Sequence, residues 1–218
     1  MLTNRAKSFA LVVTTGIAAL LAVMALVYTV EQRRTKAETG AVLSAFFSQT
    51  VLHDMEKWAE GRTVEIVVQR KPDCGLCPGA GVGFETHSWF ARSFKARASS
   101  VSDDPWFAQS SRTTRATFLL NSLFSTDIST DLRLPSGARA VFVSPSDLGS
   151  KPSDFEVKFP NNLGYFVVSR IGLNANRTEA LLYFDHFCAG LCGGGAYVLM
   201  RKVDGAWYVA DQRGTWVS

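Results

Sequence analysis

The sequence predicts an α+β protein, with an N-terminal transmembrane helix followed by one domain in which helices pack on one face of an antiparallel sheet. Three observations lead to this prediction. Residues 9–30 form an uncharged apolar run, residues 39–60 repeat apolar side chains at helical spacing, and residues 165–211 hold four short runs rich in β-branched and aromatic residues. A chain of 218 residues has room for one substantial domain and an appendage.

The apolar run at residues 9–30 predicts a membrane anchor. Its 22 residues are enough to cross a hydrocarbon core about 30 Å thick at about 1.5 Å per residue. The alternative is a signal peptide cleaved near Val23-Met24-Ala25. The run continues for five residues beyond Ala25, which favours an uncleaved signal anchor. We therefore expect residues 1–36 to be the anchor with its basic flanks, and residues 37–218 to be a single extracytoplasmic domain.

The charge distribution argues against nucleic-acid binding. The chain has 23 Lys and Arg against 19 Asp and Glu, and residues 1–36 hold five of the basic residues and one of the acidic ones. The rest of the chain is therefore neutral, with 18 of each. Such a domain lacks the excess of Lys and Arg that binds a phosphate backbone.

The first half of the domain alternates helical and strand patterns. An amphipathic helix is expected over residues 39–60, and its inward face would hold Leu43, Phe47, Val51, Met55 and Trp58. A strand at 64–68 and a glycine-rich loop at 71–83 follow. Asp104 and Pro105 are typical of a helix start. A helix over 113–124 with Phe118, Leu119 and Leu123 inward, a strand at 138–143 and a turn at 144–146 complete this half.

The C-terminal part predicts an antiparallel meander. Its strands are expected at residues 165–173, 180–187, 196–203 and 207–211. Asp204-Gly205 suits a two-residue type I′ turn. That turn would set Val203 opposite Ala206, Lys202 opposite Trp207 and Met200 opposite Val209. Lys202 and Trp207 would then form a cross-strand cation–π pair.

The four cysteines occur as two close pairs, Cys74 with Cys77 and Cys188 with Cys192. Structural disulfides are the favoured interpretation for an exported domain, and three connectivities are open. A Cys₄ zinc site is a second interpretation, because both spacings suit zinc ligands. A redox pair is the third, but residues 78–83 are a poor helix start beside the C-x-x-C motif. No cofactor is expected under the favoured interpretation.

One cluster of residue types could carry catalysis. Asp185, His186 and Cys188 provide an acid, a base and a nucleophile within four positions. Neighbours in a regular strand point to opposite faces, however, so we expect a structural His186. Aromatic side chains at strand spacing could line a groove but are more typical of a core, namely Tyr165, Tyr183, Tyr197 and Trp216.

The C-terminal residues resemble those of a known family. The runs SRIGLN, ALLYF and CAGLCGGGAYVL, the spacing of Lys202, Gly205 and Trp207, and the final Trp216 and Ser218 are similar to the signature of small bacterial exported or membrane-anchored proteins of unknown function. The resemblance covers residues 163–218 and extends more weakly to residue 115. It implies an envelope location and offers no catalytic or binding residues.

Taken together, these patterns predict a single-pass protein of the bacterial inner membrane, held by residues 9–30, with its domain in the periplasm or outside the cell. We expect a non-enzymatic binding or envelope-associated module, stapled by disulfides, that recognises a protein or small molecule. The alternative is a thiol-redox or zinc-dependent enzyme that uses Cys74, Cys77, Cys188 and Cys192.

Overall fold

A computed structural model describes the backbone of residues 2–53, 63–70, 104–121, 128, 132–148, 155, 157–160, 162–187 and 193–217. Within these ranges it describes side chains from residue 21 onward, except at 145, 148 and 163. Contacts divide the chain into two compact units, Met1–Glu38 and Thr39–Ser218.

The first unit is formed by most of one long helix, α1 (Leu2–Phe46). Seven large apolar side chains of this helix between Leu21 and Val30 are exposed. No helix among the described residues combines the length and apolarity that a membrane crossing requires. The crossing predicted at residues 9–30 also depends on positions before 21, whose side chains lie outside the described set, so it stays a prediction.

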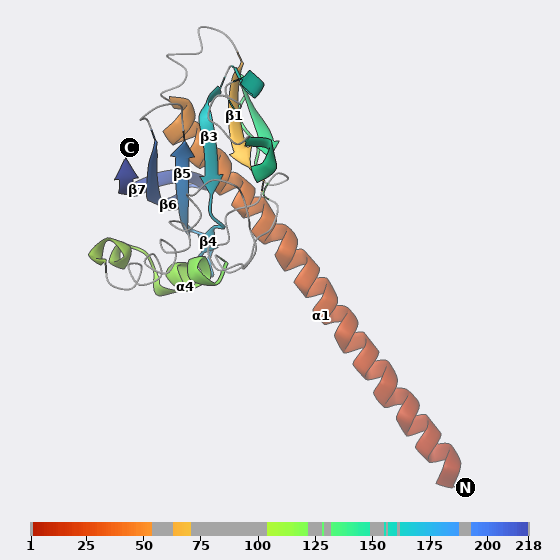
Figure 1. Cartoon of the computed structure of the whole chain (residues 1–218). Coiled ribbons are helices and arrows are strands. Elements are labelled where there is room, and N and C mark those ends of the chain that lie inside the picture. Colours follow the sequence, from red (N-terminus) through yellow and green to blue (C-terminus); the bar gives the residue numbers. More distant parts are fainter. Residues whose placement is uncertain are drawn as a thin grey trace. The chain divides into compact units, whose positions relative to one another are not determined.

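The second unit is built on a seven-stranded mixed sheet (Figure 1). Its strands are β1 (Val64–Gln69), β2 (Ala138–Val143), β3 (Asn162–Val168), β4 (Gly172–Leu173), β5 (Glu179–Phe187), β6 (Gly194–Val203) and β7 (Ala206–Val217). The strand order is β2-β1-β3-β5-β6-β7, with β4 paired to β5. β1 runs parallel to β2 and β3, whereas the remaining pairs are antiparallel.

The prediction of a purely antiparallel sheet is therefore wrong in the N-terminal half. The connections from β1 to β2 and from β2 to β3 are long enough to return the chain to the same end of the sheet, which parallel pairing requires. The C-terminal meander of β5, β6 and β7 is as predicted.

Helical segments cover both faces of the sheet, not one face as predicted. The end of α1 and the π-helical turn η1 (Phe47–Val51) pack with Ala180 and Leu182 of β5. The short helix η2 (Pro105–Gln109) and helix α4 (Arg112–Asn121) pack with Leu181 and Tyr183. Because alternate residues of a strand face opposite sides, these two clusters lie on opposite faces. Apolar residues at successive positions of β5 make this two-sided burial favourable.

The amphipathic helix predicted over residues 39–60 is present in its first part. Leu43, Phe47 and Val51 are buried as predicted, whereas Met55 and Trp58 lie outside the described residues. The helix widens at η1, where Phe46 and Phe47 are both fully buried although they are neighbours in sequence.

The predicted helix start at Asp104 is confirmed, although η2 is a 3₁₀-helix. The Asp104 carboxylate accepts a hydrogen bond from the Trp106 backbone N–H at 2.8 Å. In α4, Phe118 is buried and Leu119 packs at the edge of the same cluster, while Leu123 lies outside the described residues. β2 has the predicted bounds, and the turn expected at 144–146 leads into the 3₁₀-helix η3 (Pro145–Leu148).

The predicted hairpin at Asp204-Gly205 is confirmed with its register. Both residues have positive φ, 49° and 83°, and Lys202 pairs with Trp207, with its Nζ 5.5 Å from the ring centroid. The strand predicted at 165–173 is instead divided into β3 and β4. Ser169 lies in the break, where its hydroxyl accepts a hydrogen bond from the Tyr183 backbone N–H at 2.8 Å.

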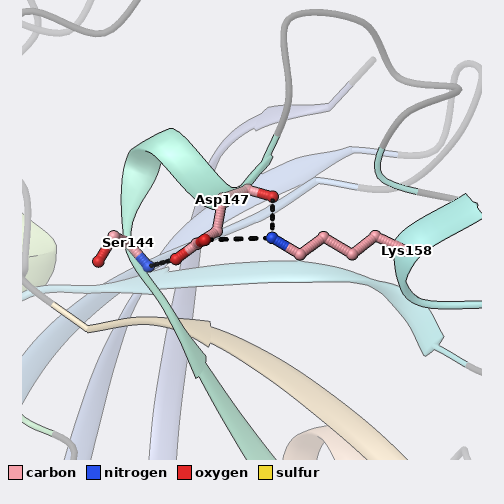
Figure 2. A network of polar contacts seen from close by, with 3 residues as sticks. All are labelled: Ser144, Asp147 and Lys158. Atoms are coloured by element: carbon pink, nitrogen blue, oxygen red, sulfur yellow. Dashed lines mark hydrogen bonds and ion pairs between the residues drawn. The ribbon is translucent and has the colours of Figure 1, made fainter.

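A polar network beside η3 ties two surface segments together (Figure 2). The Asp147 carboxylate accepts a hydrogen bond from the Ser144 backbone N–H at 2.8 Å. Lys158 donates to the same carboxylate at 3.1 Å and to the Asp147 carbonyl oxygen at 3.2 Å. The bond from Ser144, followed by the contact with Lys158, lowers the pKa of Asp147. The network thus favours the charged carboxylate.

Replacing Asp147 with Asn should lower stability at neutral pH but not in acid. A carboxyl whose pKa is lower in the folded state contributes stability above its unfolded pKa, and loses it as the pH falls through its folded pKa. Because the site is open to water, the loss should be small. Urea midpoints of the wild type and D147N, measured over an acid-to-neutral series, should converge at low pH. A difference that persists unchanged into acid would contradict this account.

Candidate functional site

The strongest polar cluster in the described part of the domain surrounds Asp185. This residue lies in β5 opposite Gly195 of β6, and Gly195 lies opposite Trp216 of β7. The Asp185 side chain is almost completely buried, at 1% exposure. Its Oδ1 accepts hydrogen bonds from the Tyr183 hydroxyl at 2.5 Å and from the Trp216 indole N–H at 2.7 Å. A buried carboxylate needs such donors to offset its lost hydration.

Gly195 and Thr215 complete this group. We call it the Asp185 cluster, and its members are Tyr183, Asp185, Gly195, Thr215 and Trp216. The Thr215 hydroxyl donates to the Gly195 carbonyl oxygen at 2.9 Å and lies 3.3 Å from the Tyr183 hydroxyl. A Cβ at position 195 would lie only 2.3–2.5 Å from Trp216 Nε1, Tyr183 Oη and Asp185 Oδ1. Glycine is therefore required there, because it lets the three polar groups converge over the β6 backbone.

The proposed catalytic residues Asp185 and His186 are not brought together. Asp185 points to the face covered by η2 and α4 with Tyr183. His186 lies against Phe166, with ring centroids 4.3 Å apart and an interplanar angle of 6°, and Phe166 belongs to the opposite core. The expected alternation of the two side chains is thus confirmed. Cys188, the third candidate, lies outside the described residues.

The aromatic side chains expected in the core pack against one another. Tyr183 and Tyr197 are buried, with ring centroids 4.9 Å apart. Tyr165 stacks on Phe187 across paired strands at 4.9 Å and 19°, and Phe187 lies 5.5 Å from Trp216. Tyr165, Phe187 and Trp216 are only half-buried, so of the four aromatic residues expected in the core, Tyr183 and Tyr197 are core residues.

The four cysteines lie outside the described residues, so the structure does not test the predicted disulfides or the alternative zinc site. Among the described residues, no three His, Asp or Glu side chains are grouped as metal ligands would be. Residues 188–192, which contain Cys188 and Cys192, lie in the sequence between β5 and β6.

Sequence reasoning identified Asp185 but not the residues that bind it. An acidic residue two positions after Tyr183, at the end of an apolar strand, is the signal for a buried carboxylate that needs donors. Thr215 and Trp216 are at least 30 positions away, and their contact depends on how β6 and β7 pair.

Comparisons with protein-family models, curated proteins and solved structures found no match for this chain. The features that bear on function are therefore those of the chain itself.

Gly195→Ala should destabilise the domain, whereas Gly214→Ala should not. The added methyl group at 195 would collide with the Asp185 cluster, and such overpacking typically costs about 1–3 kcal/mol. A methyl group at 214, in the neighbouring strand β7, meets no atom within 4 Å. Urea unfolding should show a lower midpoint for G195A than for G214A. Equal midpoints would contradict the close packing around Gly195.

Proposed function

We propose that this chain is a single-pass protein of the bacterial inner membrane whose C-terminal domain acts outside the cytoplasm as a non-enzymatic binding or envelope-associated module. The observation that carries the non-enzymatic part is the arrangement at Asp185 and His186. The one candidate acid is buried and bonded to Tyr183 and Trp216, and the candidate base packs on the opposite face. A nucleophile activated by a base, with an acid that orients that base, needs these groups within hydrogen-bond reach of one another.

The apolar surface of α1 supports the anchor. Leu21, Val23, Met24, Leu26, Val27, Tyr28 and Val30 are all exposed. Positions 26, 27 and 28 alone cover about 200° of a helix that turns about 100° per residue, so the apolar side chains are not confined to one stripe. A partner helix covers one stripe, whereas lipid covers all sides. Lipid is therefore the cover that we propose for this segment and for the apolar residues that precede it.

The Asp185 cluster supports the proposal that the domain presents a loop as a binding surface. It links the ends of β5, β6 and β7 through side-chain hydrogen bonds. Residues 188–192 leave from these ends, and we propose that a disulfide-stapled loop there forms part of the binding surface. In this proposal the buried carboxylate holds the strands in register and does not act on a substrate.

The proposed location and staples can be tested on the full-length chain recovered from membranes. We expect it to stay in the membrane pellet after alkaline carbonate washing. Intact mass should show no alkylation before reduction and a gain of about four mass units on reduction, because each disulfide takes up two hydrogens.

The same experiment distinguishes the alternatives. Release by carbonate would overturn the anchor. Thiols that react without reduction, or a zinc ion retained in the native mass spectrum, would replace the binding module with the thiol or zinc enzyme, because the two cysteine pairs would then be chemically available.

A further inference from the structure

Helix α1 continues beyond the apolar segment that we propose to lie in lipid. The exposed apolar side chains of that segment end at Val30, and the helix runs on to Phe46. The eight residues after Val30, positions 31–38, include three basic and two acidic residues. Because one helix holds them all, their positions around its axis follow from a turn of about 100° per residue.

Two cations and one amide gather on one side of this part of α1. Gln32, Arg33 and Lys36 fall within an arc of about 100°, and all three side chains are exposed. No acidic residue stands three or four positions from Arg33 or Lys36 in the sequence, which are the spacings at which helical neighbours form ion pairs. We call these three residues the basic stripe. It presents positive charge and hydrogen-bond donors together.

Arg34 lies on another side of the helix, about 100° from Arg33. Glu31 stands three positions before it and Glu38 four positions after it. At these spacings the carboxylates lie beside a cation on the helix surface and offset its charge. Arg34 is as exposed as Arg33 in class but has acidic neighbours, so it is a matched control for Arg33.

The basic stripe lies at the depth of a lipid headgroup layer. A bilayer is about 30 Å thick in its hydrocarbon core and about 40–45 Å thick with its headgroups, so each polar layer is about 5–7 Å thick. At about 1.5 Å per residue, Arg33 begins about 4.5 Å beyond Val30 and Lys36 about 9 Å beyond it. The Cα–Cβ bonds of a helix tilt toward its N-terminus, which here is toward the apolar segment. The long side chains therefore lean back into the headgroup layer.

We propose that the basic stripe binds the phosphate of an anionic phospholipid at the end of the anchor. The Arg33 guanidinium donates two parallel hydrogen bonds to phosphate oxygens, and Lys36, one turn further on, adds a second positive charge. Two like charges this close on a helix repel each other, and an anion between them removes that repulsion. A zwitterionic headgroup has its own cation, so charge complementarity selects an anionic lipid. The site rests on the proposed function, because it meets headgroups only when the apolar segment lies in a membrane.

The test is lipid retention by the full-length chain in detergent micelles with equal amounts of phosphatidylglycerol and phosphatidylcholine, measured by native mass spectrometry. We expect the wild type to retain more phosphatidylglycerol, and added salt to reduce this preference. Arg33→Gln should lower the preference about fivefold, which is the effect of one basic residue beside an anionic membrane. Arg34→Gln should keep most of it, because Glu31 and Glu38 already offset the charge of Arg34.

Both variants should fold as the wild type does, since Arg and Gln have similar helix propensities and both positions are exposed. Equal retention of the two lipids by the wild type, or equal losses in R33Q and R34Q, would overturn the lipid site and leave the anchor in place. Retention of neither lipid by the wild type would overturn the anchor and the lipid site together.

Discussion

Burial of β5 on both faces is the constraint on which the rest of the domain depends. Ala180 and Leu182 are completely buried against the end of α1, while Leu181 and Tyr183 are buried on the face covered by η2 and α4. Burying a large apolar side chain stabilises the fold by about 1.5–3 kcal/mol, and a strand that does so at successive positions needs cover on both sides. The helical segments of unit Thr39–Ser218 are divided between the two faces for this reason. A helix layer on one face alone would leave half of β5 in water.

The same constraint explains the character of the candidate site. Where an apolar strand continues into a buried Asp185, the carboxylate must be bonded or the strand loses stability. Tyr183 from the same face and Trp216 from β7 supply the donors, and Gly195 supplies the space between them. The outcome is a polar cluster that joins the three strands β5, β6 and β7. The burial of Asp185 and its hydrogen bonds within the cluster are consistent with a role in holding the strand ends.

The turn η1 covers both a face and an edge of the sheet. Phe47 and Val51 fill the core above β3 and β5, whereas Gln49 on the same turn reaches the outer backbone of β7. A π-helical turn adds a residue to the helical repeat, and here neighbouring Phe46 and Phe47 are both buried. The covered face and the covered edge are thus linked in one segment.

The sequence by itself determined the features that depend on neighbouring residues. Short-range patterns account for the Asp204-Gly205 turn and for the register of Lys202 with Trp207. They also account for the cap at Asp104, for strands β1 and β2, and for the inward positions of Leu43, Phe47 and Val51. Only the tertiary structure decided the parallel pairing of β1, the break at Ser169, the two-sided cover, and the partners of Asp185 and of the β7 edge. Gln49 and Val209 are 160 residues apart, and no local pattern encodes such a contact. It exists because Phe47 and Val51 of η1 share one core cluster with Met200 of β6 and Trp207 of β7, and this packing brings Gln49 to the backbone of β7.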